Sequence, residues 1–213
     1  MPAAGGSLSF WTSYDTEPGW DHVFVEARTP GGDDWTTLPD ANGHTGTGVG
    51  ESCPAGWVGL HPQLAHYQTW DGTAACTAVG TTGSWNAATG NSAGWQQWRV
   101  DLSAWSGRTV EVSIASASDW AVQGVGAFVD DVTLPDGTVQ SFEDDLGGWV
   151  VPGAPPGSAA NANDWLRAAA GAFPVGASIT TRDTVLMGFG VEGITMKDQQ
   201  ATVLGRAVGH LLP

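Results

Sequence analysis

The chain has 213 residues and a mass of 22.0 kDa, enough for one large domain or one domain with an ordered appendage. Asp and Glu total 22 against 7 for Lys and Arg, which gives a formal net charge of -15 and a pI near 4.2. A field of this sign repels phosphate backbones and anionic lipid, so we expect neither nucleic acid nor a membrane as a partner. No apolar run approaches the ~18 residues that a membrane-spanning helix needs.

The composition is typical of a secreted β-rich protein. Charged residues make up 14% of the chain, while Gly (31) and Trp (12) are abundant. An average soluble domain has about 25% charged residues. The segment Met1–Gly6 carries neither the basic nor the apolar region of a secretory signal peptide. Either the protein is cytosolic or the chain is a segment of a larger exported protein. The second fits better, so we expect the chain to work outside the cell.

The first part of the chain predicts strands. Apolar and polar residues alternate over 7–14 and over 22–28, and a short third run covers 35–38. The turns between these runs are 15–21 and 30–34, and the glycines of the second turn supply positive φ at little cost. The beginning of the chain is therefore predicted to be β-structure.

Residues 39–94 differ from the runs on either side. They are rich in Gly, Thr, Asn and Ala, show no sustained period and contain Cys53 and Cys76. A structureless stretch of this length is unusual in a compact domain, so we interpret it as an elaborated loop excursion. The cysteines are either two unrelated buried thiols or a disulfide worth about 3 kcal/mol. The low Lys content and the loop-rich surroundings favour the disulfide.

Four later runs predict further strands. They are 95–102, 109–116, 126–134 and 139–143. In the second of them Val110 and Val112 alternate with Glu111, the pattern of a half-buried antiparallel strand. We therefore expect residues 1–146 to form a β-sandwich that carries the loop excursion 39–94.

The rest of the chain, 147–213, begins with a connection rich in Pro, Gly, Ala and Asn that we expect to run over a surface. Two short strands are predicted at 178–181 and 184–189. Apolar residues then recur at helical spacing over 201–212, and Thr195 is a candidate N-cap. We expect one C-terminal amphipathic helix that packs on the sandwich or, alternatively, on a neighbouring domain.

Eight strings of the sequence occur together in an order similar to that of a known family. They are LSFWTSYDTEPGWDHVFVEA, DDWTTLPDANGHT, SCPAGW, GNSAGWQQWRVDLS, VEVSI, GAFVDDV, SFEDDLGGW and DTVLMGFGVEGI. In this order they resemble the non-catalytic C-terminal region of secreted bacterial zinc carboxypeptidases of the carboxypeptidase-A-like class. A related region ends the immune inhibitor A metalloproteases, and both are distantly similar to MAM-type β-sandwiches. The resemblance covers nearly the whole chain. It implies an all-β, jelly-roll or MAM-like sandwich that accompanies a catalytic peptidase domain and performs no chemistry itself.

Several carboxylates lie where an early and a late strand of such a sandwich would meet at one edge. They are Asp15, Glu17, Asp21, Asp130, Asp131 and Glu143. Carboxylates gathered at one edge repel one another unless a cation holds them, and Ca²⁺ accepts six to eight oxygens. The resemblance favours the same idea, because sandwiches of this kind frequently carry a structural calcium. The alternative is a solvated acidic rim. The first choice of ligands is Asp131, Asp130, Glu17 and Asp21.

No complete catalytic set is visible in the sequence. Residues 90–94 match the G-x-S-x-G elbow of α/β-hydrolases, but no apolar strand precedes them, so we expect a polar hairpin loop. His61 and His66 could offer two imidazoles to zinc, but no Cys or carboxylate close in sequence completes the set, and no H-E-x-x-H occurs. Paired carboxylates could hydrolyse glycosides, but only the abundance of acid and Trp recommends that. We therefore expect a non-enzyme.

The tryptophans allow two readings. Those within predicted strands are expected to pack the core: Trp11, Trp35 and Trp98. Those in turns or loops either pack beneath long loops or form platforms for sugar rings, with Trp20, Trp57 and Trp70 as the candidates if a sugar is bound. We accordingly expect a non-catalytic accessory domain of a secreted zinc metallopeptidase that stabilises or positions the catalytic domain or its protein substrate. The alternative is a carbohydrate- or surface-binding module.

Overall fold

The computed structural model of the chain describes residues 1–119, 121–122, 124–159, 164–168, 178–180 and 185–187. The chain divides into two compact units, Met1–Trp165 and Leu166–Pro213. The strands of the first unit are β1 (Ser7–Asp15), β2 (His22–Arg28), β3 (Thr36–Leu38), β4 (Thr69–Trp70), β5 (Cys76–Thr77), β6 (Gln96–Asp101), β7 (Glu111–Ala117), β8 (Gly126–Thr133) and β9 (Val139–Gln140). Its helical turns are α1 (Trp57–Leu60), η1 (Pro62–His66) and η2 (Ser103–Trp105).

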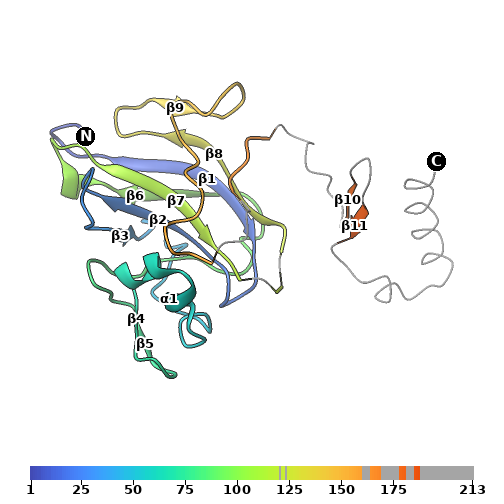
Figure 1. Cartoon of the computed structure of the whole chain (residues 1–213). Helices are drawn as coiled ribbons and strands as arrows, with labels where there is room; N and C mark the ends of the chain where they lie inside the picture. The colour runs from blue at the N-terminus through green and yellow to red at the C-terminus, as the bar shows by residue number, and fades with distance from the viewer. Residues whose placement is uncertain (120, 123, 160–163, 169–177, 181–184, 188–213) are drawn as a thin grey trace, which may run out of the picture. The chain divides into compact units, whose positions relative to one another are not determined.

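Two antiparallel sheets form a β-sandwich. One sheet has the strand order β6-β1-β8-β9 and the other the order β3-β2-β7 (Figure 1). The main core takes Leu8 and Phe10 from β1, Trp98 from β6 and Val23 and Val25 from β2, so side chains of both sheets share one interior. This confirms the predicted all-β sandwich. No helix in the described part of the chain is long and apolar enough to span a bilayer.

The chain passes repeatedly between the two sheets. It leaves β1 for β2 of the other sheet, returns in β6, crosses again to β7 and comes back in β8. The pairing of β1 with β8 shifts register between Ser9 and Trp11, opposite Asp131, whose φ of 48° lies in the left-handed region. The predicted strands of the first unit are thus present, and a β-bulge marks the end of β8.

The excursion 39–94 covers the outer face of β2. Phe24 on that face packs with Trp57, Tyr67 and Trp85 of the excursion in a second core. As a result β2 is buried on both faces, with only Arg28 at its end half-buried, instead of alternating. Figure 1 shows α1 and the β4–β5 hairpin of this excursion beside the sandwich.

A disulfide joins two distant parts of the excursion. Cys53 and Cys76 are bonded, with their Cα atoms 6.1 Å apart and a sequence separation of 23. Cys53 is fully buried, and it lies just before α1, whereas Cys76 begins β5. The predicted disulfide is therefore confirmed, and it attaches the β4–β5 hairpin to the segment that packs over β2.

After β9 the chain continues as a strap along the sandwich, the orange segment of Figure 1. Trp149 packs against the main core, Gly157 lies against Pro62, and the amide of Ala159 donates to the carbonyl of Leu60 at 2.9 Å. In the second unit, β10 (Ser178–Thr180) and β11 (Val185–Met187) form an antiparallel hairpin within the predicted strand ranges. The predicted helix over 201–212 and its cap Thr195 lie outside the described residues, so the helix stays a prediction.

Candidate functional site

The carboxylates predicted to bind calcium lie at different places along the β1–β8 pair. Asp15 pairs with Gly126 at one end, whereas Asp130 pairs with Trp11, four residues along the strand. At the rise of a β-strand this separation is about 13 Å. Asp131 follows Asp130, and Glu143 comes after β9, which pairs with the same far end of β8.

Glu17 and Asp21 lie in the turn after β1, near the Asp15 end. The carboxylate of Asp21 accepts hydrogen bonds from the backbone amides of Glu17 at 3.1 Å and Asp119 at 3.2 Å. Burial raises the pKa of Asp21, and partial desolvation with the charges of Asp119 and Asp21 raises the pKa of Glu17. Asp119 is an acidic neighbour that the sequence analysis missed, because it comes from the far end of β7.

Within the described residues, no group of three or more His, Cys, Asp and Glu side chains is arranged to hold a metal ion. Asp21 ties the β1–β2 turn to the segment after β7, so its oxygens are already engaged with backbone amides. The geometry thus gives the acidic turn a structural role.

A serine and a histidine meet beneath the excursion. The Nε2 atom of His22 lies 3.1 Å from the hydroxyl oxygen of Ser52, which is also 3.2 Å from the carbonyl oxygen of Val49. The two residues are only 2% and 1% exposed, and burial lowers the pKa of His22 to about 4. The pair is therefore shielded from solvent in the folded chain. It fastens the excursion to the start of β2, and the separation of the two residues in sequence gave no signal for it.

The other candidate catalytic residues are used in local structure. The hydroxyl of Ser92 accepts a hydrogen bond from the amide of Tyr14 at 2.9 Å and lies 2.7 Å from the carbonyl of Gly94, in a loop before β6. His61 stacks edge-on against Trp57, at 5.4 Å between ring centroids. His66 lies 2.8 Å from the hydroxyl of Thr82. The predicted loop at Ser92 is present, and the two histidines have separate partners.

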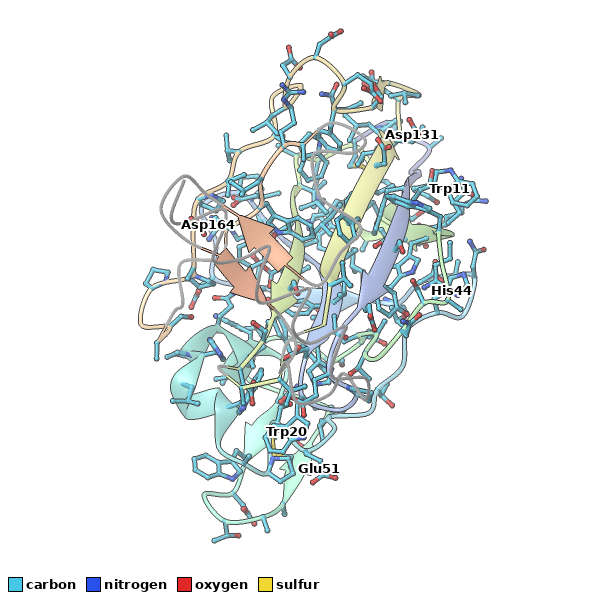
Figure 2. All side chains as sticks on the ribbon, turned by 90° about the vertical axis from the view of Figure 1, so that its right-hand side faces the viewer. Trp11, Trp20, His44, Glu51, Asp131 and Asp164 are labelled. Atoms are coloured by element: carbon cyan, nitrogen blue, oxygen red, sulfur yellow. A yellow bond between two sulfur atoms is a disulfide. The ribbon has the colours of Figure 1, made fainter. Side chains whose placement is uncertain are left out.

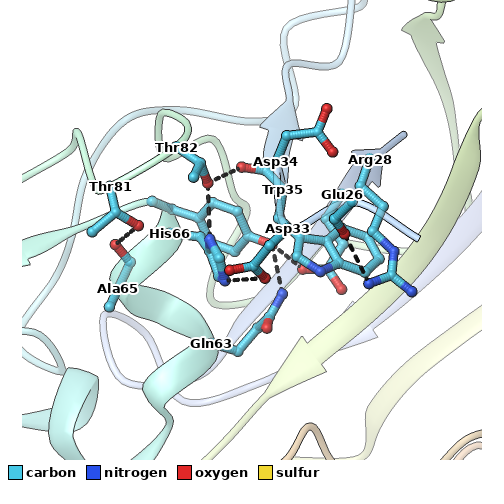
Figure 3. A network of polar contacts seen from close by, with 12 residues as sticks. Glu26, Arg28, Asp33, Asp34, Trp35, Gln63, Ala65, His66, Thr81 and Thr82 are labelled. Atoms are coloured by element: carbon cyan, nitrogen blue, oxygen red, sulfur yellow. Dashed lines mark hydrogen bonds and ion pairs between the residues drawn. The ribbon is translucent and has the colours of Figure 1, made fainter. Parts of the chain in front are cut away.

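A buried acid lies at the centre of a network between β2 and η1 (Figure 3). Glu26 is 6% exposed on the outer face of β2 and accepts a hydrogen bond from the phenol of the fully buried Tyr67. Gln63 donates to the same phenol oxygen at 3.1 Å. Burial raises the pKa of Glu26, although its hydrogen bonds to Tyr67 and Gln63 lower it. Burial, and then the charge of Glu26, raise the pKa of Tyr67.

The exposed rim of this network is held by an arginine. Arg28 makes two hydrogen bonds to Glu111 of β7, at 3.0 and 2.8 Å, and its guanidinium lies 4.5 Å from the ring centroid of Trp35. Trp35 in turn accepts a hydrogen bond through its carbonyl from Thr82 at 2.6 Å. The rim therefore links both neighbours of β2 to the excursion.

The tryptophans considered for sugar binding lie together in the excursion region. Trp57 is 2% exposed and packs against Trp20 at 6.5 Å between ring centroids, so its ring is not presented to solvent. The ring of Trp70 lies over Gly56, which has a φ of 94°. Trp98 is fully buried, as expected of a core residue. These rings pack beneath or within the excursion.

The expectation that Trp11 packs in the core is wrong, because its side chain is 40% exposed. Leu8, Phe10 and Tyr14 of β1 point inward, so Trp11 lies on the opposite, outer face of the sheet. Figure 2 shows it projecting outward from β1, the blue strand. The alternation of residues along this strand was present in the sequence and could have predicted the outward position of Trp11.

Polar residues flank Trp11 on both neighbouring strands. Gln97 of β6 and Asp130 of β8 are its partners in register. Gln97 is exposed and Asp130 is half-buried. Trp95, which immediately precedes β6, is 54% exposed. The outer face of the four-stranded sheet thus has an indole between an amide and a carboxylate.

Comparison of the chain with protein-family models, with curated proteins and with solved structures gives no match.

Proposed function

We propose that this chain is a non-catalytic accessory module of an extracellular protein, and specifically of a secreted zinc metallopeptidase, which it stabilises or whose protein substrate it positions. The observation that carries the proposal is the closed His22–Ser52 pair. The side chains best suited to nucleophilic chemistry, 2% and 1% exposed, contact each other inside the fold and hold the excursion in place. The link to a peptidase rests on the family resemblance of the sequence strings.

Two further features support parts of this proposal. Disulfides persist mainly in oxidising compartments, so the Cys53–Cys76 bond supports an extracellular setting. The repeated passage of the chain between two antiparallel sheets is compatible with the jelly-roll or MAM-like class that the resemblance implies. We propose that class as the finer description of the sandwich.

Enzymatic turnover tests the non-catalytic role. The purified chain should leave peptide, ester and glycoside substrates unchanged, and Ser52 and Ser92 should not react with a fluorophosphonate probe. Hydrolysis that disappears in Ser92→Ala or Ser52→Ala would contradict the proposal. The coding sequence around the gene tests the accessory role, which requires a zinc-peptidase domain in the same polypeptide or beside it.

Structural calcium stays a prediction of the sequence. After chelation, millimolar Ca²⁺ should raise the melting temperature if a folded-state site exists, because a ligand that binds only the native state stabilises it. An unchanged melting temperature would count against a structural calcium. Glu17→Gln and Asp131→Asn are informative together, because they lie at opposite ends of the β1–β8 pair.

A second candidate function, a carbohydrate-binding module, is favoured by one observation. Trp11 is exposed at the centre of a sheet face whose neighbouring side chains can form hydrogen bonds. An accessory module with such a face could hold its parent enzyme near a glycan. The two candidates are compatible, because binding requires no catalytic group.

A further inference from the structure

The exposure of Trp11 is unusual for its position. β1 has neighbours on both sides in the order β6-β1-β8-β9, so Trp11 is in an interior strand and not at an edge. The other residues of β1 on this face are small and polar, with Ser9 and Ser13 on either side of Trp11. A large indole among serines leaves apolar surface in water and contributes little to the core.

The neighbours of Trp11 supply hydrogen-bonding groups at the same level of the sheet. Cβ atoms of directly opposite residues lie about 4.5–5.5 Å apart, so Gln97, Trp11 and Asp130 form one row across three strands. Within the described residues, the side-chain amide of Gln97 has no hydrogen-bond partner. The carboxylate of Asp130 accepts one bond, from the amide of Asp131 at 2.8 Å, and retains further acceptor capacity.

A second exposed tryptophan, Trp95, lies two positions before Gln97 in the sequence. Trp95 precedes Gln96, the first residue of β6, and Gln96 pairs with Thr12 beside Trp11. Trp95 and Gln97 are two positions apart, which in an extended chain corresponds to about 7 Å between their Cα atoms. Two tryptophans and two polar groups therefore occur within a few residues of one another on three adjacent strands.

The chemistry of this row selects the class of ligand. Pyranose rings have apolar C–H faces that stack on an indole and equatorial hydroxyls that need amide or carboxylate partners. The net charge of -15 and the carboxylates of Asp130 and Asp131 disfavour a polyanion. A protein partner would need about 800 Å² of surface with an apolar centre, whereas the residues around Trp11 are serines, Gln97, Arg99 and Asp130.

We propose that the Gln97–Trp11–Asp130 row, extended by Trp95, is a binding site for a neutral pyranose polysaccharide. The sugar ring stacks on the indole of Trp11, the amide of Gln97 donates to a ring hydroxyl, and the carboxylate of Asp130 accepts from another. This inference deepens the carbohydrate-binding candidate and assigns residues to it. It differs from the sequence-based choice of Trp20, Trp57 and Trp70.

The test is binding of the whole chain to defined neutral polysaccharides. Soluble xylan, mixed-linkage β-glucan and galactomannan are used in affinity electrophoresis, and cellulose and chitin in pull-down, with alginate as the polyanionic control. We expect retention by at least one neutral polymer and none by alginate. Trp11→Ala should weaken binding about tenfold or more, because the stacked ring is lost. Gln97→Ala should weaken it less.

Trp70→Ala is the matched control, because it removes the same side chain in the excursion. Its binding should equal that of the unmodified chain, and circular dichroism should show that all variants are folded. Retention that is equal in Trp11→Ala and the unmodified chain overturns the assignment, and so does the absence of retention by every neutral polymer. Sedimentation gives a separate check. Self-association that Trp11→Ala abolishes would show a protein interface and overturn the proposal. None of these outcomes bears on hydrolysis, which tests the non-catalytic role, or on the coding sequence, which tests the accessory role.

Discussion

The phenol of Tyr67 donates a hydrogen bond to the carboxylate of Glu26, and this contact joins the excursion to the outer face of β2. Both residues are buried, at 0% and 6% exposure, so neither group can exchange its partner for water. A buried acid without a partner is costly. The excursion therefore depends on this polar contact as well as on the surrounding aromatic packing.

Tyr67→Phe should destabilise the fold by about 1–3 kcal/mol near neutral pH, because it removes the phenol donor from the buried Glu26 carboxylate. Burial raises the pKa of Glu26 above its ordinary value. Its stabilising contribution is therefore complete in acid and is lost as the pH rises through the folded-state pKa. Since the variant raises this pKa further, its deficit should grow with pH. Urea unfolding across the pH range measures the deficit.

Glu26→Gln is the control for this pH dependence. The amide does not ionise, so the deficit of Tyr67→Phe measured in the Glu26→Gln background should no longer change with pH. A deficit that still grows with pH in that background would mean that another group is responsible.

His22 should make the fold less stable in acid. Burial lowers its pKa from 6.5 to about 4, so the folded chain binds a proton at His22 less tightly than the unfolded chain does. Stability from this residue is present above 6.5 and is lost as the pH falls toward about 4. The loss is up to about 3 kcal/mol. Unfolding free energies of the unmodified chain and His22→Gln, compared at both ends of this range, isolate the effect. Parallel pH curves would contradict it.

The strands of the sandwich could be predicted because apolar and polar residues alternate along the sequence. The strands β1 and β2 lie close to their predicted ranges, although both faces of β2 are buried. The same alternation contained the outward position of Trp11, but the size and apolarity of the side chain suggested a core residue. The contact of His22 with Ser52 could not be predicted, because the two residues are 30 positions apart and Ser52 lies in the aperiodic excursion. Contacts made by an excursion depend on its path, and that path has no periodic signal.

Breaking the Cys53–Cys76 bond should lower the free energy of unfolding by about 3 kcal/mol, because the bond restricts the unfolded chain. Reduction with dithiothreitol and the double variant Cys53→Ala/Cys76→Ala should give similar losses in urea unfolding. Dithiothreitol should not affect the double variant further. A chain that is equally stable after verified reduction would show that the excursion is held by its packing and hydrogen bonds alone.

Truncation of two tryptophans should change the stability of the fold by very different amounts. Trp85 is fully buried in the second core and donates its indole N–H to the carbonyl of Gly48 at 3.0 Å. Trp85→Ala should therefore cost about 3–5 kcal/mol. Trp11→Ala should change stability by no more than about 0.5 kcal/mol, because the ring is largely outside the core. Thermal and urea unfolding compare the two. A large loss of stability in Trp11→Ala would indicate that its role is structural.

A substitution at Asp131 should increase the stability of the fold. Its φ of 48° in the β8 bulge is a conformation that glycine adopts without steric cost, and its side chain is exposed. Asp131→Gly should therefore raise the free energy of unfolding by about 0.5–1 kcal/mol. Asp130→Gly, one residue earlier in the strand, should lower it, because it removes the acceptor for the Asp131 amide and loosens an extended residue. Urea unfolding of both variants in chelator and in calcium separates backbone strain from metal binding. If Asp131→Gly is less stable than the unmodified chain in calcium alone, the carboxylate is serving a metal, and the strain account of this bulge is insufficient.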